Sequence, residues 1–218
     1  MTVHDPENTE LLDRIRGHRA GVIDDDRRFH CAVCIPLIRT DSGYDVLFEV
    51  RSGKIPAQPG DVCLPGGATE LGETALQTAV RETCEELLVK PEQISPVGES
   101  DTLREGNVVL RPFAVLLADY AGTFSAAEVA EVFRVPLEFF LGTEPDVYTF
   151  PMSYELPEDF PYDRIVGGKN YAWRETKHEA LFYEFDGRTI WGFTAKVMRA
   201  FAGMLTRKED PSCPEDTA

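Results

Sequence analysis

The chain has 218 residues, of which 43% are hydrophobic and 28% are charged, and its net charge is −16. This composition predicts a folded domain with a core, and no apolar run of about 18 residues offers a membrane span. The acidic excess argues against binding to a nucleic-acid backbone, which requires clustered lysine and arginine. Because the start, MTVHDPENTE, does not resemble a signal peptide, we expect a cytoplasmic enzyme that contacts neither nucleic acid nor membrane.

The first half of the chain predicts strands followed by one well-defined helix. Residues 51–67 are rich in glycine and proline and are expected to form a loop. The segment from Thr74 to Leu88 contains neither residue and repeats apolar positions at helical spacing, so it predicts a helix. Strands are expected at 29–38 and 44–50, joined by the hairpin turn at 40–43, and at 62–64.

The second half predicts an alternation of strands and helices that closes one domain. The last helix, GFTAKVMRAFAGML, places Phe193, Val197, Phe201, Met204 and Leu205 on one face. Together the elements predict an α/β or α+β domain with a mixed sheet flanked by helices. The expected elements are strands at 94–100 and 107–118, a short helix or turn at 126–141, an aromatic stretch at 145–173 and a hairpin around Asp186-Gly187. The predicted organisation is a lead-in at 1–28, a single domain at 29–206 and a disordered tail at 207–218.

Five cysteines, an odd number, predict free thiols: Cys31, Cys34, Cys63, Cys84 and Cys213. Cys31 and Cys34 have the spacing of a redox or zinc motif. They lie, however, in the apolar run CAVCIPLI, and no second Cys or His pair stands at ligand spacing. We therefore interpret both as buried core residues.

Three glutamates gather on one side of the predicted helix. At about 100° per residue, Glu82, Glu85 and Glu86 span an arc of about 100°. Carboxylates this close repel one another unless a cation lies between them, and hard oxygen ligands suit Mg²⁺ or Mn²⁺. The alternative is an acidic helix face in contact with solvent. The turn Leu64-Pro65-Gly66-Gly67 before the helix favours the cation site, because its glycines let backbone atoms approach an ion or phosphate.

Residues 67–89 resemble the box of the Nudix family, G-x5-E-x7-R-E-U-x-E-E-x-G-U, where U is a bulky aliphatic residue. Thr83 and Leu88 depart from it, at an aliphatic position and at the glycine that ends the helix. Because leucine resists a left-handed turn, we expect the helix to run on or to close differently. The matching positions are Gly67, Glu73, Arg81, Glu82, Glu85, Glu86 and Val89.

The resemblance implies a Nudix-type α/β/α sandwich, a mixed sheet flanked by helices, that hydrolyses a diphosphate with Mg²⁺ or Mn²⁺. Glu82, Glu85 and Glu86 would hold the metal, and Glu85 or Glu86 would also act near the attacking water. A backbone carbonyl of Gly66 or Gly67 would complete the metal site. Glu73, Arg81 and Gly67 would have structural roles, with Glu73 and Arg81 within ion-pairing reach across loop and helix.

The segment before the box is similar to the motif of the coenzyme A pyrophosphatase subfamily, LLTxR[SA]x3Rx3Gx3FPGG. Arg51, Ser52, Gly60, Pro65, Gly66 and Gly67 agree with it in register. Pro56 stands where the subfamily has a second arginine, and Leu64 replaces phenylalanine. The resemblance continues to about residue 205. It implies cleavage of coenzyme A into 3′-phosphoadenosine 5′-phosphate and 4′-phosphopantetheine.

Residues outside the box are expected to complete the site. Glu128 has two interpretations, a distal carboxylate that acts as metal ligand or general base, or a surface glutamate that starts a helix; Glu131 is the second candidate. Arg51, Lys54 and Arg111 are the candidates for contact with the substrate phosphates, and Arg104 is a further candidate. The alternative for each is an ordinary basic residue at the surface. The aromatic stretch 145–173 either walls a pocket or, as aromatic clusters more often do, forms core and dimer contacts.

Three hypotheses follow for the function. The first is a diphosphatase for coenzyme A or acyl-coenzyme A, and the second a Nudix hydrolase for another nucleotide such as ADP-ribose, NADH or a nucleoside triphosphate. The third is a Nudix-fold binding module without turnover, which the retained carboxylates disfavour. The expected partner is a small nucleotide diphosphate, and a homodimer is suggested at the level of the family.

Overall fold

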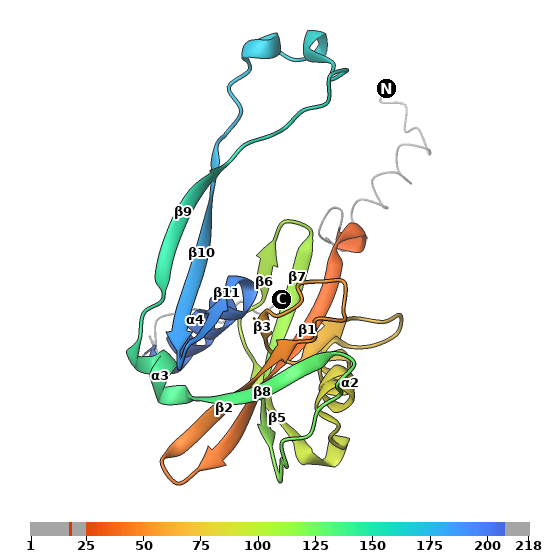
Figure 1. Ribbon diagram of the computed structural model, residues 1–218. Helices are drawn as coiled ribbons and strands as arrows, with labels where there is room; N and C mark the ends of the chain where they lie inside the picture. Colours follow the sequence, from red (N-terminus) through yellow and green to blue (C-terminus); the bar gives the residue numbers. More distant parts are fainter. Residues whose placement is uncertain (1–17, 19–24, 208–218) are drawn as a thin grey trace, which may run out of the picture.

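The computed structural model describes residue 18 and residues 25–207. Its centre is a mixed sheet with strand order β3-β2-β1-β7-β5, in which β4 also pairs with β1, β6 with β7 and β8 with β2 (Figure 1). Of these pairs, β1 and β7 are parallel and the others antiparallel. The strands are β1 Phe29–Thr40, β2 Gly43–Arg51, β3 Val62–Cys63, β4 Gly66–Ala68, β5 Ile94–Glu99, β6 Leu103–Glu105, β7 Val108–Leu117 and β8 Val129–Pro136.

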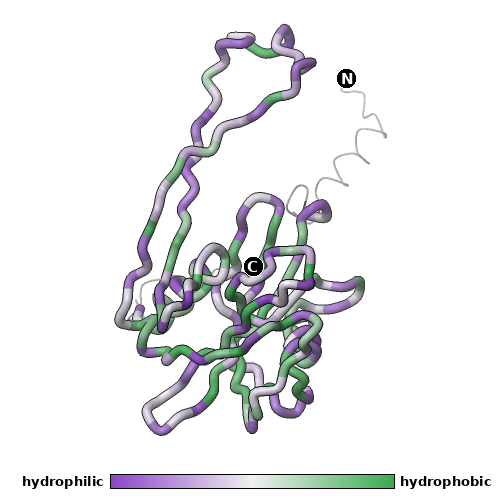
Figure 2. Tube along the Cα trace, in the orientation of Figure 1, coloured by the Kyte–Doolittle hydropathy of each residue, from purple (hydrophilic) through white to green (hydrophobic). Residues whose placement is uncertain are grey.

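Helices cover both faces of this sheet, which gives the predicted three layers. Strand β1 is buried on both sides because its side chains alternate between two cores. Ala32 and Cys34 pack toward α2 (Ala75–Leu87), whereas Ile35 and Leu37 pack toward α3 (Leu137–Gly142) and α4 (Gly192–Thr206). The hydrophobic residues are concentrated in these crossing strands of the body (Figure 2). The α/β fold with a mixed sheet flanked by helices is thus confirmed.

A second, three-stranded antiparallel sheet projects from the body (Figure 1). It contains β9 (Asp146–Met152), β10 (Thr176–Phe185) and β11 (Arg188–Trp191), and β9 and β10 extend as a long hairpin. The hairpin predicted around Asp186-Gly187 is confirmed, and both residues have positive φ angles of 48° and 72°. The remaining short elements are the 3-10 turns η1 Asp25–Arg27, η2 Pro91–Gln93, η3 Tyr162–Arg164 and η4 Gly168–Asn170.

Two predictions of local structure were wrong. Residues 129–136 form strand β8 beside β2 and not a helix, because Val129 and Val135 fill buried positions at the edge of the sheet. The buried face of α4 also differs from the predicted one, because Met204 and Leu205 are exposed. The buried residues are Ala195, Val197, Met198, Phe201 and Ala202.

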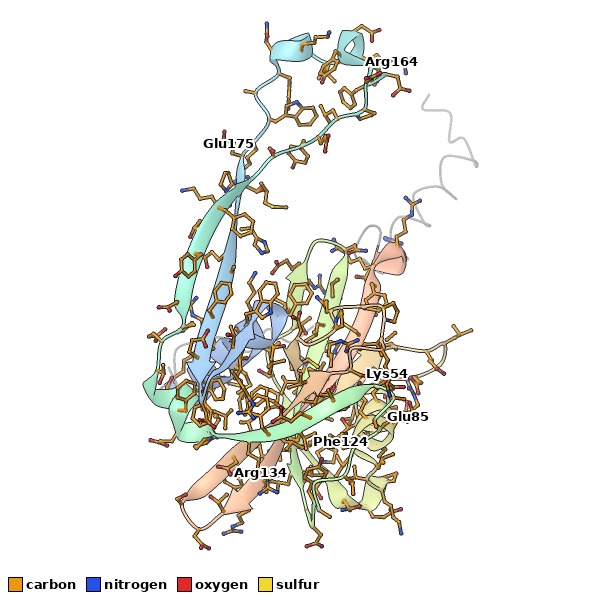
Figure 3. All side chains as sticks on the ribbon, in the orientation of Figure 1. Lys54, Glu85, Phe124, Arg134, Arg164 and Glu175 are labelled. Carbon is orange, nitrogen blue, oxygen red and sulfur yellow. The ribbon has the colours of Figure 1, made fainter. Side chains whose placement is uncertain are left out.

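The aromatic stretch 145–173 is not core. Tyr148, Tyr154 and Tyr171 are 63%, 59% and 45% exposed. Rings at the tip of the hairpin contact one another instead, among them Tyr154, Phe160 and Trp173. The labelled Arg164 lies at this tip, far from the sheet of the body (Figure 3).

The cysteines of the described segment are free thiols, as predicted. Cys34 is fully buried, while Cys31 is partly buried and packs against the core. Burial raises the pKa of both thiols to about 11, which leaves them protonated and unreactive at neutral pH. Cys213, the lead-in up to residue 24 except residue 18, and the tail from residue 208 lie outside the described residues. No helix in the described part of the chain is long and apolar enough to cross a bilayer.

Candidate active site

Helix α2 carries the predicted glutamates, and its start is fixed by Thr74. The Thr74 hydroxyl accepts a hydrogen bond from the Gln77 backbone N–H, while the Gln77 side chain accepts one from the Thr74 N–H at 2.8 Å. This capping box pairs two N–H groups that would otherwise lack partners at the helix end. Inside the helix, Thr83 is buried and its hydroxyl donates to the Ala79 carbonyl at 2.7 Å. A threonine therefore satisfies its polar group at a position where the family has an aliphatic residue.

The other end of α2 differs from the expectation. Leu88 adopts the left-handed conformation, with φ 52° and ψ 44°, and its N–H donates to the Cys84 carbonyl. The expectation that leucine would prevent this closure was wrong: the helix ends as it would with glycine. A leucine side chain is strained in this conformation, so the end of α2 lowers the free energy of unfolding relative to a glycine at the same position.

We expect Leu88→Gly to raise the free energy of unfolding by about 1 kcal/mol. Leu88 is 59% exposed, so its side chain contributes little burial that the glycine would lose. Thermal and denaturant unfolding would measure the change. Leu71→Gly is the control, since Leu71 is fully exposed and is not among the residues with positive φ. Equal stability of the Leu88→Gly variant and the parent would show that the left-handed residue is unstrained.

Arg81 joins the loop before the helix to the glutamates on it. Its guanidinium donates to both carboxylate oxygens of Glu73, at 2.8 and 3.1 Å, and to Glu82 at 2.8 Å. It also reaches Glu85 at 3.4 Å and the carbonyl of Ala68. The hydrogen bonds from Arg81 lower the pKa of Glu73 to about 2. The structure thus brings Glu73 and Arg81 together, as the sequence suggested. Arg81 in turn holds the side chains of Glu82 and Glu85 on α2.

Two glycines let the loop lie directly against the site. A Cβ on Gly66, whose φ is 154°, would stand 2.3 Å from the Ala32 carbonyl oxygen, so β4 pairs closely with β1 only with glycine there. A Cβ on Gly67 would stand 2.4 Å from the carboxyl carbon of Glu82. The Gly66 N–H donates to Glu86 at 2.8 Å. Gly66 therefore contacts Glu86 through its backbone N–H. Its carbonyl oxygen is a proposed ligand of the metal.

Glu86 lies beside a buried carboxylate that the sequence analysis missed. Glu86 and Glu49 are 5% and 1% exposed. One Glu49 oxygen accepts a hydrogen bond from the Cys63 thiol at 3.3 Å, and the other is buried without a hydrogen-bond partner. Burial raises the pKa of both carboxyls; repulsion from Glu49 adds to this effect at Glu86, and repulsion from Glu128 adds to it at Glu49. The available signal was a charged residue in the middle of the apolar strand VLFEV.

Glu128 approaches the same place from the segment before β8. It precedes β8, and its carbonyl accepts a hydrogen bond from the Ser52 N–H at 2.7 Å. Its negative charge raises the pKa of Glu82 and Glu86, after the larger effect of their burial. Glu131, the second candidate, pairs instead with Arg188. Of the two distal glutamates, the structure brings Glu128 to the box.

These carboxylates open into a cavity of about 670 Å³, which we call the glutamate cavity. Glu82, Glu86 and Glu128 line it together with Gly66 and Gly67. Glu85 does not: its side chain is 57% exposed, and it lies at the surface of the body on α2 (Figure 3). Apolar side chains form much of the remaining wall, including Phe29, Val33, Val108, Leu110, Phe193 and Val197.

The predicted phosphate-binding residues are divided by the structure. Arg51 lines the glutamate cavity, and it lies opposite an extra residue of β8, where the register between β2 and β8 shifts. Lys54 is directed toward the Ala126 carbonyl, at 3.5 Å, and does not line the cavity. Arg111 is held by two hydrogen bonds to Glu99, at 2.6 and 2.7 Å, and likewise lies outside it. Pro56, at the position of the missing arginine, forms part of the wall.

The donor set fits a hard divalent cation. Four carboxylates surround one region, Glu49 from β2, Glu82 and Glu86 from α2 and Glu128 from the segment before β8, and a buried Glu49 oxygen has no hydrogen-bond partner. In their present positions, no three His, Cys, Asp or Glu side chains of the described residues form a metal-binding group. Arg81 holds Glu82 and Glu85 in ion pairs, so a cation would compete with this guanidinium for their oxygens.

Comparison with known proteins agrees with this geometry. The NUDIX domain model matches residues 28–161. The "Peroxisomal coenzyme A diphosphatase NUDT7" of Mus musculus is 34% identical over 132 residues, 59% of this chain and 55% of the relative. "Nudix hydrolase 3" of Caenorhabditis elegans is 32% identical over 127 residues, 56% of this chain and 53% of the relative.

A bacterial relative is matched over its whole length. The "Uncharacterized Nudix hydrolase NudL" of Enterobacter sp. (strain 638) is 30% identical over 212 residues, 95% of this chain and 100% of the relative. The chain spans about half the length of the mouse and nematode relatives. The family match and the NudL relative together identify this chain as a member of the Nudix family.

Proposed function

We propose that the protein is a metal-dependent hydrolase that cleaves the diphosphate of a nucleoside diphosphate-linked substrate, and that coenzyme A or an acyl-coenzyme A is this substrate. The observation that carries the proposal is the cavity lined by Glu82, Glu86 and Glu128, in which Glu86 is backed by the buried carboxyl of Glu49. A buried cluster of like charges is costly, and cations or phosphate-bound cations offset this cost. The domain that performs this reaction is proposed to span residues 29–206.

The residues have distinct roles in this proposal. Glu82, Glu86 and Glu85 would hold Mg²⁺ or Mn²⁺, with Glu49 as a further carboxylate and the Gly66 carbonyl as a backbone ligand. When bound, the metal supplies charge neutralisation on the phosphoryl oxygens and lowers the pKa of a bound water. Glu128 lines the same cavity, and it would accept the proton of the attacking water. Arg51 contributes a positive charge at the wall, where it would bind a substrate phosphate.

Hydrolysis adds water across one bond. The water oxygen bonds to one phosphorus, the bridging P–O bond breaks, and each product keeps one phosphate. With coenzyme A the products are 3′-phosphoadenosine 5′-phosphate and 4′-phosphopantetheine. The similarity to a mouse protein described as a coenzyme A diphosphatase, and the match of Arg51 and Ser52 to the subfamily motif, support this substrate.

Pro56 supports the second candidate, a hydrolase of another nucleotide such as ADP-ribose, NADH or a nucleoside triphosphate. It occupies the cavity wall where the coenzyme A subfamily has an arginine. One charged contact to the substrate is therefore absent at this position. A binding module without turnover is the third reading, and the complete carboxylate set argues against it.

A substrate panel decides among the three functions. The protein would be incubated with coenzyme A, ADP-ribose or NADH in the presence of Mg²⁺ or Mn²⁺, and the products separated by ion-pair chromatography. We expect 3′-phosphoadenosine 5′-phosphate and 4′-phosphopantetheine to form from coenzyme A. Cleavage of ADP-ribose or NADH alone would assign the second function. If the protein binds the metal but cleaves none of the three substrates, it is a binding module without turnover.

A further inference from the structure

A second cavity, of about 830 Å³, lies between the projecting hairpin and the body, and we call it the hairpin cavity. One face of the hairpin forms its outer wall, because alternate residues of a strand point to the same side. Its wall includes Tyr148 and Phe150 from β9 and His178, Ala180 and Phe182 from β10. The opposite face of β10 is buried against the body through Leu181 and Tyr183. The hairpin therefore presents a separate aromatic face to this cavity.

The aromatic rings of this wall are arranged side by side and remain accessible. Phe182 and Trp191 stack with their ring planes 8° apart, and Tyr148 meets Phe182 edge to face. Tyr148, Phe150 and Trp191 are 63%, 44% and 42% exposed. Accessible aromatic surface that lines a concavity is typical of a binding site for apolar groups.

Charged groups fix the hairpin to the body at this cavity. Glu105 on β6 accepts a hydrogen bond from Lys196 on α4, and it pairs at 3.0 Å with His178 on β10. Three elements are thus joined by one carboxylate. All three residues line the cavity, and their contacts hold β10 in a defined position relative to α4.

The hairpin cavity adjoins the glutamate cavity. Five residues line both: Arg51, Gln58, Cys63, Phe193 and Thr194. A substrate whose diphosphate lies near Glu86 can therefore extend past Arg51 and Phe193 into the aromatic cavity. The shared wall places the hairpin cavity where another part of the same substrate would lie.

The charges of the cavity select which part of the substrate enters it. Four carboxylates line it, from Asp61, Glu105, Asp146 and Glu184, against two permanent cations, Arg51 and Lys196. Lys196 is already paired with Glu105. A phosphorylated nucleoside would meet net repulsion here, whereas an uncharged alkyl chain would gain contact with the aromatic rings.

We propose that the hairpin cavity binds the apolar acyl chain of a thioester substrate whose diphosphate is cleaved in the glutamate cavity. The proposal rests on the proposed function for its diphosphate end, and it extends that function to an acyl-coenzyme A preference. Tyr148, Phe182 and Trp191 determine the specificity by contact with the chain. The hairpin thus acts as the part of the chain that recognises the acyl group.

The two tryptophans of the chain allow a binding test that needs neither metal nor turnover. Trp191 lies in the cavity, and Trp173 lies at the hairpin tip among Tyr154, Phe160 and Tyr171. Trp173→Phe leaves Trp191 as the single emitter, and Trp191→Phe leaves Trp173 as the matched control. Each variant would be titrated with S-octanoyl-pantetheine and with pantetheine, both uncharged, and with 3′-phosphoadenosine 5′-phosphate.

We expect S-octanoyl-pantetheine to change Trp191 emission at a concentration at least about tenfold lower than pantetheine, because each buried methylene adds apolar contact. Trp173 emission should not change. The proposal is overturned if the octanoyl compound leaves Trp191 unaffected, or if 3′-phosphoadenosine 5′-phosphate changes Trp191 emission and the octanoyl compound does not. The probes contain no diphosphate, so this test does not depend on hydrolysis. It can be read even if the protein proves not to be a hydrolase.

Kinetics give an independent readout of the same proposal. Phe182→Ala should raise the ratio of the KM for octanoyl-coenzyme A to the KM for coenzyme A by about tenfold. Trp173→Ala, which removes a tip ring outside the cavity, should leave this ratio unchanged. An unchanged ratio in Phe182→Ala, with coenzyme A still hydrolysed, would contradict the acyl site and leave the proposed hydrolase intact.

Discussion

Glu86→Gln is expected to lower kcat/KM for coenzyme A by about 10²- to 10⁴-fold, the range typical of a lost catalytic carboxylate. The amide keeps the size of the side chain and can accept the Gly66 N–H, but it cannot carry the negative charge that faces the cavity. The variant should fold, because burial raises the pKa of Glu86 and favours its neutral form, so an uncharged side chain of the same size is tolerated there. Steady-state kinetics with Mg²⁺ or Mn²⁺ would measure the loss, and circular dichroism would verify the fold.

Glu92→Gln is the matched control for this experiment. Glu92 is an exposed glutamate on η2, outside the residues that line the glutamate cavity. Its substitution should leave kcat/KM unchanged. A Glu86→Gln enzyme with more than about a tenth of the parent activity would show that Glu86 is not needed for the reaction.

Gly66→Ala is expected to lower the free energy of unfolding by about 3 kcal/mol or more. The new Cβ would stand 2.3 Å from the Ala32 carbonyl oxygen and 2.6 Å from the Val33 Cα, so it meets backbone that cannot move without disturbing β1. The φ of 154° adds strain for any residue with a side chain. Urea denaturation of the two proteins would measure the difference.

Two other glycines separate this effect from a general cost of alanine. Gly67→Ala meets the flexible end of Glu82, at 2.4 Å, so we expect it to displace this carboxylate and reduce activity more than stability. Gly53→Ala has no heavy atom within 4 Å of the new Cβ and should be tolerated. Equal stability of all three variants would contradict the close approach of β4 to β1.

Local sequence information predicted the helix and the layers of the fold. The absence of glycine and proline from 74 to 88, with apolar residues at helical spacing, located α2 within a residue at each end. The apolar runs at 29–38 and 107–118 predicted the strands β1 and β7. Spacing along one helix likewise predicted that Arg81 and the glutamates share a region, because neighbours on a helix face are neighbours in space.

Other features depend on contacts between distant segments and were missed for that reason. The charge of Glu49 within VLFEV marks it as unusual, but local sequence does not show that the fold places it beside Glu86 of α2. Leu88 accepts a left-handed conformation because the surrounding structure closes the helix there, against its own preference. The aromatic stretch was expected to be mainly core, since sequence does not distinguish rings that line a projecting hairpin from rings that fill an interior.

The thermal midpoint in the presence of Mn²⁺ tests most directly whether the buried carboxylates form a metal site. We expect Mn²⁺ at 100 times its Kd to stabilise the native protein by about 2.7 kcal/mol and to raise Tm accordingly. Glu86→Gln should lose most of this increase, and Glu92→Gln should keep it. An equal increase of Tm in the parent and in Glu86→Gln would contradict the assignment of the metal to these glutamates.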